Sequence, residues 1–148
     1  MDRRTPLADD GCMTTTARLS TTDRPALTSR GNRTVLLADA ALTGVNGLAY
    51  AAVSDPLAKL FGIDRGLLIW LGVFLLIVGL GVAVLATRTP IPRRGVALLA
   101  ELNLVWVAAS IGFAFIADLT TVGVVWTVLQ AAIVLAFAVR QLQISRTR

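Results

Sequence analysis

The chain has 148 residues, of which 55% are hydrophobic and only 16% are charged, and its mean hydropathy is +0.73. This composition excludes an ordinary soluble domain and indicates an integral membrane protein, with the lipid bilayer as its expected partner. The 14 basic residues are scattered between apolar runs rather than grouped with aromatic residues, which argues against binding to nucleic acid despite a pI near 11.0.

Missing residue types narrow the chemistry further. The sequence has no His and a single Cys, Cys12, so the usual metal-site spacings and an intramolecular disulfide are both excluded. A Ser–His or Cys–His nucleophilic pair cannot form, and the glycine-rich phosphate-binding motifs are absent. We therefore expect no enzymatic activity, no cofactor and no metal.

The first segment, residues 1–32, is rich in Thr, Ser, Asp and Arg and shows no sustained periodicity. Such a segment buries too little apolar surface to fold alone, so it is predicted to be a disordered tail. Nothing in residues 1–12 has a structural signature, and Met13 is a candidate alternative start. The first apolar run begins too late in the chain for a conventional cleaved signal peptide.

Four apolar runs follow, and each approaches the roughly 20 residues that a helix needs to cross the hydrocarbon core. They cover residues 34–53, 67–87, 95–117 and 121–139. The second run carries no charge, and the others are too long for buried strands in spite of isolated polar residues. The sequence therefore predicts an all-α polytopic membrane protein, a four-transmembrane-helix bundle over residues 33–143, with a short tail over 144–148.

The connections between the runs agree with this prediction. Pro56 disfavours helix in the residue before it, which ends the first run. Three apolar residues at helical spacing then predict a short interfacial turn that closes near Gly62: Leu57, Leu60 and Phe61. Residues 88–94 form a proline-broken turn, and residues 118–120 leave room only for a tight hairpin.

Basic residues are distributed unevenly between the two sides of such a bundle. The side of both termini carries Arg3, Arg4, Arg18, Arg24, Arg30, Arg33, Arg88, Arg93, Arg94, Arg140, Arg146 and Arg148. The opposite side has only Lys59 and Arg65. Because basic residues are retained on the cytoplasmic side, we predict a multi-pass protein of the bacterial cytoplasmic membrane with both termini inside the cell.

Depth along each helix, at about 1.5 Å per residue, sorts the polar residues into two layers. Asp39 and Glu101 lie about 7–9 Å from the cytoplasmic side, and Arg140 ends the fourth run on that side, so these three predict a charge cluster. Four residues fall nearer the midplane and form the second layer: Asn46, Asn103, Trp106 and Gln130.

The polar residues also share helix faces. Steps of four, three and four residues place one polar stripe on the first run: Asp39, Thr43, Asn46 and Tyr50. The second run instead offers the small residues Gly72, Gly79 and Ala83, which permit close helix packing. The polar stripes are either interhelical hydrogen-bond contacts or the lining of a substrate or proton path, and the shallow position of Asp39 favours the first interpretation.

Three segments resemble uncharacterised small four-span integral membrane proteins of actinobacteria: "TGVNGLAYAA", "NLVWVAAS" and "VLQAAIVLAFAVRQLQ". The resemblance extends over about 110 residues, from the first run to the fourth, and it implies the fold and compartment but no catalytic residues. Small multidrug transporters also have four spans and a carboxylate in the first helix, but this sequence lacks their motif context.

We therefore expect a non-enzymatic structural or accessory membrane subunit whose polar stripes hold the bundle together. The alternative is a small proton-coupled transporter that acts as a homo-oligomer, since four helices leave little room for a pathway within one subunit. The expected protein partners are further copies of the chain or the members of a larger membrane complex.

Overall fold

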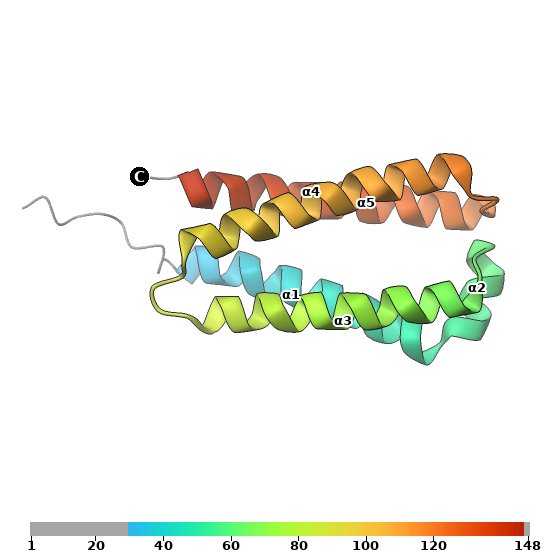
Figure 1. Cartoon of the computed structure of the whole chain (residues 1–148), viewed down its shortest axis with the longest axis horizontal. Coiled ribbons are helices and arrows are strands. Elements are labelled where there is room, and N and C mark those ends of the chain that lie inside the picture. The colour runs from blue at the N-terminus through green and yellow to red at the C-terminus, as the bar shows by residue number, and fades with distance from the viewer. Residues whose placement is uncertain (1–29, 147–148) are drawn as a thin grey trace, which may run out of the picture.

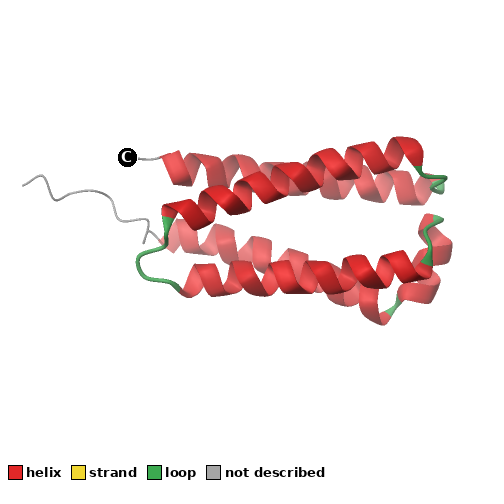
Figure 2. Cartoon of the chain, viewed as in Figure 1, coloured by secondary structure: helices red, strands yellow, loops and turns green. Residues whose placement is uncertain are grey.

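A computed structural model describes residues 30–146. This part of the chain forms five helices, which are α1 (Arg30–Ala52), α2 (Ser54–Phe61), α3 (Arg65–Thr87), α4 (Arg93–Ile116) and α5 (Thr121–Arg146) (Figure 1). Within the described residues, every helix except α2 is long and apolar enough to cross a membrane. The prediction of an all-α, four-helix membrane bundle is confirmed, and Figure 2 shows that loops occupy only the two ends.

Two helix boundaries differ from the prediction. α1 begins at Arg30, so the last three residues of the expected tail are helical. α5 continues to Arg146, beyond the predicted end at residue 139, because Gln141 and Ile144 are buried against the bundle and extend its packing. The rest of the expected tail, including Cys12 and Met13, lies outside the described residues, as do residues 147–148.

The short helix expected after the first span is present as α2. The chain bends at Val53, and Pro56 falls in the first turn of α2, where its missing N–H leaves no hydrogen bond unmade. Gly62 ends the helix at φ 74°, a left-handed conformation that favours glycine, and its N–H donates to the carbonyl of Ala58.

α2 is attached to the beginning of α5. The hydroxyl of Thr120 donates to the carbonyl of Leu60 at 2.5 Å, and the Thr120 N–H donates to the carbonyl of Phe61 at 3.0 Å. The same hydroxyl accepts the N–H of Gly123 at 3.1 Å, which caps the first turn of α5. These bonds fix Phe61 over one end of the bundle.

The long helices pack as two antiparallel pairs, α1 with α3 and α4 with α5, and far fewer contacts join one pair to the other (Figure 1). One end of the bundle, here called the terminal end, carries Arg30, Arg146 and the α3–α4 connection. The opposite end, here called the α2 end, carries α2 and the α4–α5 turn.

The α1–α3 pair is packed backbone to backbone. A Cβ added to Gly72 would lie 2.8 Å from the carbonyl oxygen of Gly47 and 2.8 Å from the N of Ala51. A Cβ on Gly79 would lie 3.1 Å from the N of Gly44. Lipid is as apolar as the helix surfaces, so close van der Waals contact of this kind, rather than the hydrophobic effect, stabilises the pair.

Arg33 closes this pair at the terminal end. Its Nε donates to the carbonyl of Ala86 at 2.8 Å, in the last turn of α3. The final carbonyls of a helix lack partners within the helix and carry partial negative charge, so a guanidinium there satisfies one of them and complements the helix dipole.

Apolar clusters lie at the two ends of the bundle. The one at the terminal end has buried residues from both helix pairs, whereas the buried residues of the other come from α1, α2 and α3. The terminal cluster contains Leu36, Ala40, Val82, Ala86, Ile91, Val96, Leu99 and Ile144. The cluster at the α2 end contains Tyr50, Ala58, Phe61, Leu68 and Leu75. Between these clusters the two pairs separate, and the candidate site lies there.

Candidate functional site

A cavity of about 590 Å³ lies between the two helix pairs. All five helices contribute to its wall, which is mostly aliphatic and aromatic with a small number of polar side chains. This volume lies within the roughly 300–1,000 Å³ of small-molecule pockets, which have the same mixture of apolar walls and few polar groups.

α1 presents two adjacent faces that differ by one residue in register. The polar stripe predicted from the sequence lines the cavity: Asp39, Thr43, Asn46 and Tyr50. The residue after each of these is small, and this second stripe lies toward α3: Ala40, Gly44, Gly47 and Ala51. A step of one residue turns the helix by about 100°, so the same four turns supply a packed face and a cavity face.

The polar group nearest the terminal end is built around Asp39. Its Oδ2 accepts the Gln141 amide N–H at 2.6 Å and the Asn103 amide N–H at 3.2 Å. Asn103 also donates to the Gln141 side-chain carbonyl at 3.0 Å, and Thr43 donates to Asp39 Oδ1 at 3.4 Å. Asp39, Asn103 and Gln141 are all buried, so this group, the Asp39 network, links α1, α4 and α5.

A second polar group, the Tyr50 network, lies nearer the α2 end and links α1 to α5. The phenolic oxygen of Tyr50 accepts the Gln130 amide at 2.5 Å and the indole N–H of Trp126 at 2.7 Å. Asn46 donates to the side-chain carbonyl of Gln130. Tyr50 is only 4% exposed, so these hydrogen bonds form within the bundle.

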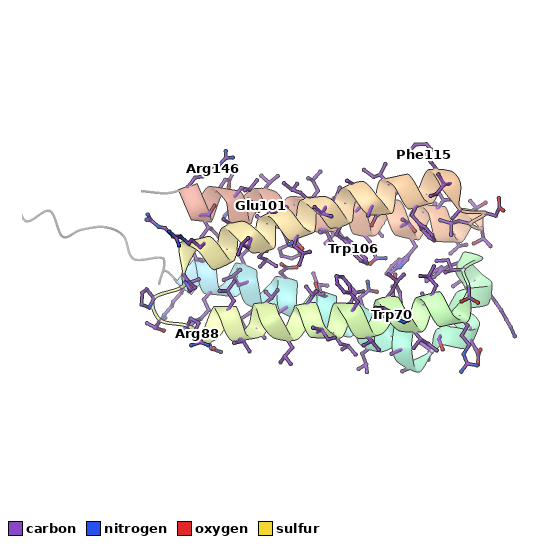
Figure 3. The ribbon with its side chains drawn as sticks, in the orientation of Figure 1. Trp70, Arg88, Glu101, Trp106, Phe115 and Arg146 are labelled. Atoms are coloured by element: carbon purple, nitrogen blue, oxygen red, sulfur yellow. The ribbon has the colours of Figure 1, made fainter. Side chains whose placement is uncertain are left out.

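Aromatic rings close two sides of the cavity. At the α2 end, Phe61 stacks on Trp126 at 6.0 Å between ring centroids and meets the edge of Tyr50 at 6.3 Å. On the side where α3 faces α4, Phe74 stacks on Trp106 at 5.8 Å. Figure 3 shows Trp106 in the space between these two helices.

The predicted charge cluster does not form among the described residues. Asp39 is buried, but Glu101 is exposed on α4, and Arg140 is exposed on α5 and donates to Gln143 at 3.1 Å. Helix rise predicts equal depth for Asp39 and Glu101, but depth says nothing about which face of the helix a residue occupies. Glu101 and Asn103 are about 200° apart around α4, so only one of them can face inward.

The prediction for the second layer is correct in part. Asn46 and Gln130, which were expected in one layer, are hydrogen-bonded, whereas Asn103 joins the Asp39 network. Gln141 was not predicted at all, although it is fully buried. A sequence signal for it exists, because Gln141 follows Gln130 by 11 residues, close to three helical turns, and therefore shares its face.

The candidate site consists of polar side chains that form hydrogen bonds, and among them is a single carboxylic acid. Of the described residues that line the cavity, Asp39 alone carries a carboxyl group, and no described basic side chain forms an ion pair with it. Among residues 30–146, no three His, Cys, Asp or Glu side chains are grouped to hold a metal ion. Every buried side-chain nitrogen and oxygen in this part of the chain has a hydrogen-bond partner.

A scan against protein families, a search of curated proteins and a search of solved structures each find no match to this chain. The resemblance to four-span actinobacterial membrane proteins therefore stays a prediction.

Proposed function

We propose that this integral membrane protein is a non-enzymatic structural or accessory subunit of the bacterial cytoplasmic membrane. The observation that carries the proposal is the Asp39 network, which joins three helices and whose polar side chains are hydrogen-bonded to one another. In a bilayer, interhelical hydrogen bonds of this kind contribute about 0.5–2 kcal/mol each. None of the described residues that line the cavity with Asp39 is a His, Cys, Lys or Arg, so the lining supplies no thiol and no basic partner for catalysis.

Charge at the ends of the bundle supports an orientation with both termini in the cytoplasm. At the terminal end, the described part of the chain carries Arg30, Arg33, Arg88, Arg93, Arg94, Arg140 and Arg146. The α2 end has Lys59 and Arg65, and Arg65 pairs with Asp55. A reporter that is active only outside the cell, fused after Arg148, is expected to be silent, and a strong signal would overturn this orientation.

A proton-coupled transporter is the second candidate, and one observation favours it. Asp39 is at the same time buried and part of the cavity wall, which is where a proton-carrying acid of a transport path would lie. In this interpretation several copies of the chain assemble, since a single bundle offers one cavity rather than a complete path.

Asp39→Asn separates the two functions, with Glu101→Gln as the matched control at similar depth on an exposed face. Proton flux is measured in vesicles loaded with a pH-sensitive dye, and stability by denaturant unfolding in detergent. The structural role predicts no flux in any of the three proteins and a loss of about 1 kcal/mol in Asp39→Asn alone. Flux in the unaltered protein and in Glu101→Gln, but not in Asp39→Asn, would overturn the structural role.

The partner is tested separately by affinity capture in mild detergent with determination of the particle mass. A mass equal to a small multiple of the chain supports a homo-oligomer, and a mass that includes other membrane proteins supports an accessory subunit of a larger complex.

A further inference from the structure

The cavity between the helix pairs is open on one side. Four of its wall residues, two on α1 and two on α5, are also 50% to 68% exposed: Leu42, Val45, Val125 and Leu129. In a membrane-spanning bundle, exposed aliphatic residues at this depth meet acyl chains. The opening therefore faces the bilayer and not the aqueous phase.

The cavity is long and narrow. Its lining extends from Asp39 to Tyr50 on α1, about 16 Å, and from Val122 to Phe137 on α5, about 22 Å. A volume of 590 Å³ spread over about 20 Å gives a mean cross-section of about 30 Å².

The cross-section decides what fits. Aliphatic carbons in contact lie about 4–4.5 Å apart, so an extended hydrocarbon chain needs about 20 Å². A helix with its side chains is at least about 10 Å wide and needs about 80 Å², which is more than the mean cross-section of the cavity. An acyl chain therefore matches the cavity more closely than a helix from a second copy of the protein does. Water is also a poor occupant, because the wall is mostly apolar and its buried polar atoms already have partners.

We propose that one acyl chain of a bilayer phospholipid enters between α1 and α5 and occupies this cavity. The two apolar clusters and the aromatic rings limit the chain at both ends, and the Phe74–Trp106 stack limits it on the α3–α4 side. The polar side chains of the wall are already hydrogen-bonded to one another, so a hydrocarbon chain can enter without breaking these hydrogen bonds. The bound lipid would be part of the bundle's structure between its two helix pairs.

Three tryptophans allow a direct test, because Trp126 lines the cavity whereas Trp70 is 75% exposed on α3. The full chain is reconstituted in phosphatidylcholine vesicles brominated at the middle of both acyl chains, since bromine quenches indole fluorescence on contact. The first variant, Trp70→Phe with Trp106→Phe, retains Trp126 and its bond to Tyr50. The second, Trp106→Phe with Trp126→Phe, retains Trp70 as the lipid-facing reference.

We expect quenching of Trp126 to reach at least about half that of Trp70, because the chain lies in contact with it. Ala49→Phe, which adds a ring to the cavity wall, should reduce Trp126 quenching severalfold and leave Trp70 quenching unchanged. Ala41→Phe is the matched control, because Ala41 is exposed on the same helix outside the cavity lining, and it should change neither signal.

Two results would overturn the proposal. Trp126 that is not quenched while Trp70 is quenched would mean that no acyl chain enters. Quenching of Trp126 that appears only when the protein is strongly diluted in lipid would mean that a second copy covers the opening. Neither result depends on proton flux, so the proposal can fail while the structural role of the Asp39 network stands, and the reverse also holds.

Discussion

α1 takes part in two interfaces that are stabilised in different ways. Toward α3 it presents small residues, and the two backbones touch at Gly47 and Gly72. Toward α4 and α5 it presents long polar side chains, which reach across to Asn103 and Gln141. The interface with α3 is tight because no side chain separates the two backbones. The interface with α4 and α5 encloses a cavity because only the ends of long side chains make contact across it.

Two faces of α1 that differ by one residue in register thus form two different kinds of interface within the membrane. Both interfaces come from the same turns of α1, and the hydrophobic effect favours neither of them in lipid. Small residues allow dispersion contacts along the whole length of a helix pair, whereas hydrogen bonds act at single points and hold the pairs at a distance. We therefore expect changes at the tight interface to cost more than changes at the polar one.

The largest effect is expected from Gly72→Val. Its side chain would meet the backbone of α1 within van der Waals distance, so α1 and α3 must move apart, at a cost of about 3 kcal/mol or more. The free energy of unfolding in detergent micelles is measured by circular dichroism. Gly81→Val on the same helix is the control, because a Cβ there meets nothing within 4 Å, and an equal loss in both variants would contradict the backbone contact.

Gln141→Leu tests the polar interface at its most buried point. The substitution removes a donor to Asp39 and an acceptor for Asn103. It leaves these two buried groups with only the 3.2 Å hydrogen bond that joins them, at a cost of about 1–3 kcal/mol. Gln143→Leu makes the same chemical change on an exposed face two residues away, and we expect about 0.5 kcal/mol or less. Equal unfolding free energies of the two variants would mean that the Asp39 network does not contribute to the stability of the bundle.

Tyr50→Phe is expected to have a smaller effect. It keeps the ring against Phe61 but removes the oxygen that accepts from Trp126 and Gln130, for a loss of about 1 kcal/mol. The emission of Trp126 should also change, because its indole N–H loses its acceptor. This emission is measured with Trp70→Phe and Trp106→Phe in the background, and an unchanged spectrum would contradict the Trp126–Tyr50 hydrogen bond.

The spans could be predicted from the sequence, and the inward faces of the helices could be predicted only in part. Run length and hydropathy depend on composition, so the four spans could be predicted, and the spacing of Asp39, Thr43, Asn46 and Tyr50 correctly predicted a single stripe. The rotation of α4 and α5 about their axes depends on the packing of both helices. It decided that Asn103 and Gln141 face inward while Glu101 and Arg140 face outward.

The cavity could not be predicted for a related reason. Its volume depends on how far the two helix pairs stand apart, which no local pattern encodes. The polar residues between the pairs could be predicted in part, since Asn46 and Gln130 were expected in one layer near the midplane. Gln141 was missed because it follows the charged Arg140, where the apolar run had already ended.

The smallest effect is expected from Asp55→Asn, and it sets the scale for the others. Asp55 pairs with Arg65 at 3.2 Å, but both side chains are about 60% exposed, so solvent screens the pair to about 0.5 kcal/mol or less. Added salt should reduce this small difference in unfolding free energy further, since it screens exposed charges. Salt should leave the cost of Tyr50→Phe unchanged, because that contact is buried and neutral. An equal response of both substitutions to salt would mean that the polar interface of α1 is solvated like the protein surface. The difference in stability between this interface and the tight interface with α3 would then come from packing alone.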